Sequence, residues 1–239
     1  MSNVIFSNLM IKQQLILLHG ALCDATMFKE FGSHLEKDFE IFSVSFSGHG
    51  KKEFTIADFS IQLFADELEQ FIIEKKLNPA TIFGYSMGGY VALWLARFKP
   101  SLVKSVFTLA TKLIWNAEIA ERECKMLSAD KMEEKIPVYA ALLKERHGAD
   151  WKKTVKQTAA LITNLGLHHL INSDFKNIKA HVHLAIGDMD NMVTQEETTN
   201  VQSLISGSTF SVLDNTQHAF EKTDVTLLVE ALKKHILPS

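Results

Sequence analysis

The chain has 239 residues, of which 46% are hydrophobic and 22% are charged. This length suits one large domain or a domain with an insertion, and it is enough to bury a sizeable core. The formal net charge of −3 gives no reason to expect a nucleic acid as a partner.

The N-terminus and the cysteines bear on the compartment. The N-terminus has no basic segment leading into a long apolar stretch, and no run reaches the roughly 18 apolar residues that a membrane span needs. The two cysteines, Cys23 and Cys124, form neither a disulfide framework nor a metal-ligand spacing. We therefore expect a cytoplasmic protein with reduced thiols and no membrane contact.

Short apolar runs alternate with segments of helical periodicity in the first half of the chain. In chain order, the patterns predict a strand at Gln14–Leu18, a strand at Glu40–Phe46, a helix at Ile56–Lys76, a strand at Pro79–Phe83, a helix at Tyr90–Phe98 and a strand at Leu102–Leu109. Glycine-rich polar segments follow the strands, as in His19-Gly20 and Ser47-Gly48-His49-Gly50.

The stretch from Lys112 to Asp174 shows no strand pattern. It predicts about four helices, at Ala117–Ser128, Asp130–Arg146, Asp150–Thr163 and Leu167–Asn172. Strands at His181–Ile186 and Thr209–Leu213 follow, and an amphipathic helix at Asp224–Ile236 ends the pattern. We therefore predict a core of residues 1–111 and 180–239, with residues 112–179 inserted as a helical lid.

This alternation predicts an α/β fold with a mostly parallel sheet covered by helices on both faces. Ligands of such sheets bind beyond the carboxyl ends of the strands, where the glycine-rich segments of this chain fall. A helical insertion between two strands would lie over that edge.

The segment Gly84-Tyr85-Ser86-Met87-Gly88 matches the pattern G-x-S-x-G. A predicted strand precedes it and a predicted helix follows it, which is the context that a nucleophile elbow requires. Such a sharp turn exposes the serine, and the helix N-terminus favours developing negative charge. Ser86 is therefore the predicted nucleophile.

A serine hydroxyl needs a base and a group that orients the base. Of the ten histidines, His218 is the one in a loop after the last predicted strand, which suits the chain order serine, acid, histidine. Asp188 and Asp190 both follow the strand His181–Ile186. We favour Asp190 as the orienting acid and interpret Asp188 as a turn residue.

Acyl transfer also needs donors for an oxyanion. The backbone N–H of Met87 and that of Ala21, in the loop after the first strand, are the predicted donors, with Leu22 as the alternative to Ala21. His19 and His49 are interpreted as residues that brace their loops. The candidates for substrate binding are Leu22, Tyr85, Trp115 and Tyr139, with Trp151 as a further lid residue. For the three aromatic lid residues, Trp115, Tyr139 and Trp151, packing within the lid is the favoured alternative.

In these segments the sequence resembles the α/β-hydrolase family. The resemblance extends from His19-Gly20 through Gly84-Tyr85-Ser86-Met87-Gly88-Gly89 and Gly187-Asp188-Met189-Asp190 to Gln217-His218-Ala219-Phe220-Glu221. It implies the fold and a Ser-Asp-His triad, but it says little about the substrate because the fold serves many chemistries. The short lid is similar to that of small esterases of the family, such as the pimeloyl-carrier-protein methyl ester esterases and the enol-lactonases.

The resemblance implies a serine hydrolase that cleaves an ester, thioester or lactone. One alternative is a hydrolase or lyase acting on carbon–carbon bonds, similar to the family's menaquinone-synthesis enzymes. Those resemble Ser-x-Gly-Gly-Arg after the elbow, whereas this chain has Tyr90 there. The other alternative is a binding protein without catalysis. Neither a metal nor another cofactor is expected.

The lid has an excess of basic residues, with 12 Lys and Arg against 9 Asp and Glu in residues 112–179. A cluster near the junction of two predicted helices contains Lys144, Arg146, Lys152, Lys153 and Lys156. It predicts either a solvated helix face or a docking surface for an acidic partner, such as an acyl carrier protein. Besides that partner, we expect a small-molecule ester or acyl substrate.

Overall fold

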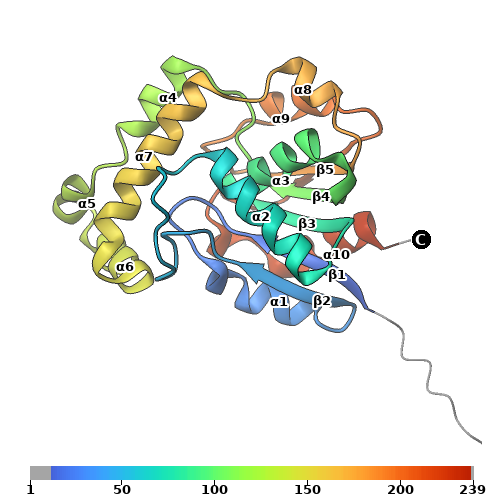
Figure 1. Cartoon of the computed structure of the whole chain (residues 1–239), viewed down its shortest axis with the longest axis horizontal. Coiled ribbons are helices and arrows are strands. Elements are labelled where there is room, and N and C mark those ends of the chain that lie inside the picture. Colours follow the sequence, from blue (N-terminus) through green and yellow to red (C-terminus); the bar gives the residue numbers. More distant parts are fainter. Residues whose placement is uncertain (1–11, 238–239) are drawn as a thin grey trace, which may run out of the picture.

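The computed structural model describes residues 12–237, and their centre is a six-stranded sheet (Figure 1). The strands are β1 Gln13–Leu18, β2 Phe39–Val44, β3 Ala80–Tyr85, β4 Val103–Leu109, β5 His181–Gly187 and β6 Thr209–Leu213. Their order is β2-β1-β3-β4-β5-β6, and every neighbouring pair is parallel. The predicted α/β fold with a parallel sheet is confirmed.

The central strands are apolar throughout because helices cover both faces of the sheet. Leu15 and Leu17 of β1 face one layer, whereas Ile16 and Leu18 face the other. The first layer contains α1 Lys29–Leu35 and α10 Val225–Ile236, and the second contains α2 Ile61–Lys75, α3 Met87–Phe98 and α9 Gln195–Gln202. Short 3₁₀ helices lie at Ala25–Phe28, Pro100–Leu102, Gly148–Asp150 and Phe220–Lys222.

Five helices lie between β4 and β5. They are α4 Ala117–Cys124, α5 Ala129–Lys135, α6 Pro137–His147, α7 Trp151–Leu167 and α8 Asn172–Lys176. Figure 1 shows α4 to α7 together at one end of the sheet, beyond the strand ends, with the green α4 beside the yellow α7. We call residues 112–179 the helical insertion.

The boundaries inside the insertion differ from the predicted ones. Asp130–Arg146 is not one helix, because the chain breaks at Ile136, the residue before Pro137, where the α conformation is sterically disfavoured. The predicted helix at Leu167–Asn172 is wrong as well. There the Leu170 N–H donates to the Tyr90 hydroxyl at 2.8 Å, and α8 begins only at Asn172.

Two helices of the core have no counterpart among the predicted elements. The first, α1, has Gly32 in its middle, and α9 has the polar sequence QEETTNVQ, so neither shows a strong apolar repeat. Within residues 12–237, no helix is both long enough and apolar enough to cross a lipid bilayer.

Candidate active site

Ser86 lies at the turn between β3 and α3, where its backbone is strained. Its φ is +50° and its ψ is −116°, a conformation that costs an L-residue on the order of 1–3 kcal/mol. The Ser86 N–H donates to the Leu109 carbonyl at 2.8 Å, and the Thr111 hydroxyl donates to the Ser86 carbonyl at 3.0 Å. These bonds from the end of β4 and the segment after it hold the half-buried serine in place.

Two glycines of the elbow allow this close packing. A Cβ on Gly84 would lie 2.5 Å from the Gly89 Cα, so the strand and the helix could not approach as they do. A Cβ on Gly88 would lie 2.3 Å from the Leu18 carbonyl oxygen of the adjacent strand. The pattern G-x-S-x-G is therefore a packing requirement of this turn.

The structure brings Ser86, His218 and Asp190 together from three separate segments. The Ser86 Oγ lies 3.4 Å from the His218 Nε2, and the His218 Nδ1 lies 2.8 Å from the Asp190 Oδ2. A serine–histidine distance of this size is at the long end for a hydrogen bond. The imidazole is thus held between the hydroxyl and the carboxylate.

Asp190 is placed to remain ionised. Its side chain is fully buried, and its Oδ1 accepts from the backbone N–H groups of Met192 at 2.8 Å and Val193 at 2.9 Å. Burial alone would raise the pKa of the Asp190 carboxyl, but the hydrogen bonds and the interaction with His218 outweigh it and hold this pKa below its ordinary value.

Asp188 has a different neighbour. Its Oδ1 accepts from the Thr216 N–H at 3.0 Å, and so connects the β5 end to the loop that carries His218. The Tyr85 hydroxyl, at the end of β3, donates to the His218 backbone carbonyl at 2.9 Å and so holds the same loop against the sheet. Burial raises the pKa of the Tyr85 hydroxyl, which therefore stays protonated.

A small cavity of about 100 Å³ opens beside Ser86. Ala21, Met87 and His218 line it together with Ser86, so both predicted oxyanion donors come from residues at this cavity. Most of the wall is apolar and comes from α2, α3, α7 and the segment after β5, namely Ile61, Tyr90, Leu161, Ile162, Leu165, Met192 and Val193.

Trp115 also lines this cavity, as do two charged residues, Lys112 and Glu123. The Lys112 Nζ lies 3.6 Å from the Glu197 Oε2, and the other Glu197 oxygen accepts from the N–H groups of Leu113 and Ile114. The lysine charge is thus compensated by a carboxylate that also holds the start of the insertion.

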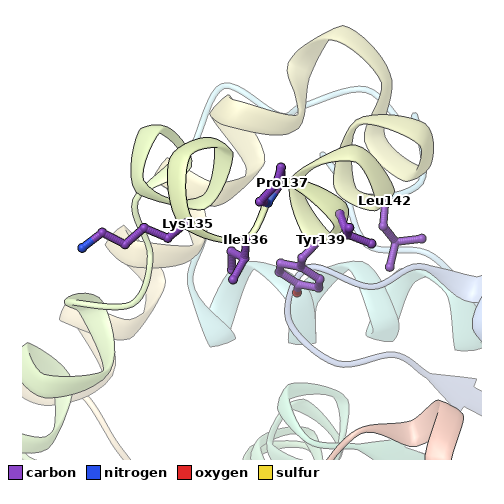
Figure 2. Close-up of a pocket in the computed structure, with 6 residues that line it drawn as sticks. Lys135, Ile136, Pro137, Tyr139 and Leu142 are labelled. Atoms are coloured by element: carbon purple, nitrogen blue, oxygen red, sulfur yellow. The ribbon is translucent and has the colours of Figure 1, made fainter.

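Three other candidates for substrate binding lie elsewhere. Leu22 packs under the insertion against Met132, Leu143 and Trp151, and Tyr85 is buried beneath the His218 loop. Tyr139 borders a separate hollow of about 590 Å³ at the α5–α6 corner, which Ser86 does not line. Figure 2 shows Tyr139 beside Ile136 and Leu142, with the three side chains on the same side of that corner.

The apolar wall residues were not among the predicted site residues. Leu161 and Leu165 lie four positions apart on α7, and Ile61 belongs to the apolar repeat of α2; such patterns equally indicate core packing. The one signal in the sequence was the position of their helices around the ends of the strands, which does not distinguish individual side chains.

Three buried histidines form a cluster beside the loop after β1 that contains Ala21. His19 and His49 follow β1 and β2, and His147 ends α6; their rings are in contact, with centroids 4.9 Å apart for His19 and His49 and 5.7 Å for His49 and His147. The His19 Nδ1 donates to the Gly20 carbonyl and its Nε2 accepts from the Phe46 N–H, so this ring braces its loop as predicted. Burial lowers the pKa of His19 to about 4, and it lowers the pKa of His49 and of His147 as well.

Because of these buried histidines, we expect the free energy of unfolding to fall in mild acid. Below the ordinary pKa of 6.5, the unfolded chain binds protons at His19 that the folded chain excludes until about pH 4. Stability therefore falls as the pH falls through this window, by up to about 3 kcal/mol for His19 alone. Urea unfolding at pH 7 to 5 measures the slope.

The matched control is His34→Gln, because His34 is exposed on α1. We expect His19→Gln to reduce the pH dependence of the unfolding free energy, and His34→Gln to leave the slope of the wild type. Equal slopes in all three proteins would contradict the assignment of this dependence to His19.

The basic cluster of the insertion is partly neutralised within the chain. Lys152 pairs with Asp130 and Glu133, and the Arg146 Nη2 lies 3.6 Å from Glu221. The Lys153 Nζ lies 4.0 Å from the centre of the Phe54 ring. Docking of an acidic carrier protein stays a prediction. Charge reversal at Lys144, Lys153 and Lys156 tests it better than charge reversal at Lys152, which is already paired with carboxylates.

Comparison with known proteins gives matches over most of the chain. The sequence model described as alpha/beta hydrolase fold matches residues 14–220. A Mycoplasma genitalium protein with the provisional name esterase/lipase 2 is 34% identical over 101 residues, which is 41% of this chain and 38% of that protein. The pimeloyl-[acyl-carrier protein] methyl ester esterase of Aliivibrio fischeri is 26% identical over 133 residues, which is 55% of this chain and 49% of the esterase.

The matched parts thus span half or less of these two relatives' lengths. Among solved structures, the enol-lactonase from Burkholderia xenovorans LB400 superposes with a TM-score of 0.75 at 16% identity, over 95% of this chain and 92% of the lactonase. At this identity the likeness concerns the fold.

Proposed function

Because the chain belongs to the alpha/beta hydrolase fold family, we propose that it is a serine hydrolase that cleaves a carboxylic ester, thioester or lactone. The observation that carries the proposal is the Ser86 hydroxyl at the wall of an apolar cavity, with the His218 Nε2 at 3.4 Å and the buried Asp190 behind the imidazole. The esterases among the relatives support the same class of reaction.

The proposed reaction begins with attack of the Ser86 Oγ on the carbonyl carbon, while its proton passes to the His218 Nε2. The electron pair of the carbonyl moves to its oxygen, which would accept hydrogen bonds from the N–H groups of Ala21 and Met87. Collapse of this intermediate breaks the bond to the alcohol or thiol, which takes the proton from His218. Water then attacks the acyl-enzyme with His218 as base and releases the acid.

Asp190 supports this sequence through His218. Its Oδ2 accepts the hydrogen bond from Nδ1–H, which leaves the lone pair on Nε2 facing the serine. The same carboxylate stabilises the imidazolium that forms during attack. The two N–H donors on Oδ1 hold the carboxylate in this orientation.

The cavity limits the size of the acyl group. A volume of about 100 Å³ with Ile61, Leu161 and Leu165 in the wall suits a short apolar acyl chain. The carbon–carbon hydrolase similar to the menaquinone-synthesis enzymes gains no support. Tyr90 stands where the pattern of those enzymes has an arginine that helps to bind substrate carboxylates, and its neutral hydroxyl, which accepts from the Leu170 N–H, supplies no positive charge.

The test combines a covalent probe with a substrate panel. We expect a fluorophosphonate probe to label Ser86, identified by peptide mass spectrometry, and we expect turnover of p-nitrophenyl acetate and butyrate to exceed that of the octanoate. Simple lactones and acyl thioesters complete the panel. A folded protein that neither takes the label nor hydrolyses any member would contradict the proposal and favour a binding protein.

A further inference from the structure

The turn that contains Ala21 holds a residue in an unfavourable conformation. The Cys23 N–H donates to the Gly20 carbonyl at 3.2 Å and closes the turn, and Leu22 inside it has a φ of +59°. This left-handed conformation costs a non-glycine residue on the order of 1–2 kcal/mol. Contacts outside the turn are therefore needed to keep it closed.

Closure of the turn determines where the Ala21 N–H points. The Gly20 carbonyl and the Ala21 N–H belong to the same planar peptide group and point in opposite directions. The Gly20 oxygen accepts from the Cys23 N–H and, at 2.8 Å, from the His19 Nδ1. Because these two hydrogen bonds fix the direction of the Gly20 carbonyl, they also fix the opposite direction, in which the Ala21 N–H points.

The contacts that hold the turn come from the end of α6. The Leu22 carbonyl accepts from the Arg146 Nη1 at 2.8 Å and from the His147 Nε2 at 3.0 Å. The His147 Nδ1 accepts from the Gly50 N–H at 3.1 Å, so this neutral ring joins two loops of the core to the insertion.

The Leu22 side chain adds an apolar contact with the same region. It is 5% exposed and packs with Leu143 of α6 and with Trp151 and Val155 of α7. Both the side chain and the carbonyl of this strained residue are therefore held by the helical insertion rather than by the sheet.

We propose that Arg146 and His147 are positioning residues for the oxyanion donor. By holding the Leu22 carbonyl, the end of α6 fixes the orientation of the Ala21 amide, so that turnover depends on the position of the helical insertion. The inference rests on the proposed hydrolase function. Neither side chain lines the cavity beside Ser86, so their effect acts through the turn and not through substrate contact.

The experiment uses Arg146→Met, which keeps an apolar stem but removes the donor, and Arg146→Lys, which keeps a positive donor. We expect kcat of Arg146→Met on p-nitrophenyl butyrate to fall about tenfold with KM within about twofold, since loss of a whole oxyanion donor costs roughly a hundredfold or more. Arg146→Lys is expected to recover most of kcat. Rates are expressed per active site titrated with the fluorophosphonate.

A trifluoromethyl ketone with the same acyl chain separates positioning from mere loss of structure. Its hemiketal adduct with Ser86 carries the oxyanion. The inhibition constant is therefore expected to rise in proportion to the fall in kcat/KM. The matched control is Arg97→Met, because Arg97 also joins the core to the insertion, through Asp174 at 3.0 Å, without touching the turn. We expect Arg97→Met to keep the kcat of the wild type.

Two results would overturn the inference. One is an unchanged kcat per titrated site in Arg146→Met; the other is a fall in kcat without a matching loss of affinity for the ketone. In both cases a wild type that is labelled at Ser86 and turns over ester leaves the hydrolase proposal standing. A wild type without labelling and without turnover removes the hydrolase proposal, and this inference falls with it.

Discussion

Replacing Ser86 with alanine is expected to lower kcat on p-nitrophenyl butyrate by roughly four orders of magnitude or more, while the protein remains folded. The hydroxyl is the atom proposed to bond to the substrate, and loss of one member of a serine triad costs about as much as loss of the whole unit. The backbone at position 86 stays as strained as before, because alanine meets the same steric limits at φ +50°. Thermal unfolding should therefore shift by only a few degrees.

Ser33→Ala serves as the matched control, since Ser33 is exposed on α1 and its hydroxyl donates only to the Glu30 carbonyl. This variant should keep the activity of the wild type. If Ser86→Ala retained more than about a tenth of the activity, the barrier would have changed by less than roughly 1.4 kcal/mol, and the nucleophile would have to be sought elsewhere.

The parts of the fold that the sequence predicted well depend on local patterns. Runs such as Leu15–Leu18 and Ile82–Phe83 are buried on both faces of the sheet, so every residue in them is apolar and the run stands out. The turn around Ser86 is equally local, because the approach of Gly84 to Gly89 involves residues five positions apart. Both signals can be recognised without knowing the tertiary structure.

Other features depend on contacts between distant segments. The break at Ile136 follows from Pro137 and could have been predicted. The non-helical chain at Leu170, by contrast, bonds to the Tyr90 hydroxyl, 80 positions away. Likewise, Leu22 and Tyr139 are apolar or aromatic residues near the expected site, and only the packing of α6 places one under the insertion and the other at a separate hollow. Periodicity gives the face of a helix, but it does not give its neighbour.

The two aspartates that follow β5 are expected to differ in their contribution to catalysis, although the sequence could separate their roles only by their position in the turn. Asp190→Asn should lower kcat by about four orders of magnitude, because an amide NH₂ facing the His218 Nδ1 favours the tautomer with the proton on Nε2, which cannot accept from Ser86. Asp188→Asn should cost less than about tenfold, since an asparagine oxygen can still accept from the Thr216 N–H. Steady-state kinetics of both variants on p-nitrophenyl butyrate, with thermal unfolding to verify folding, make the comparison. Equal losses in the two variants, or a larger loss in Asp188→Asn, would reverse the assignment, because only a carboxylate in contact with the imidazole can hold its tautomer.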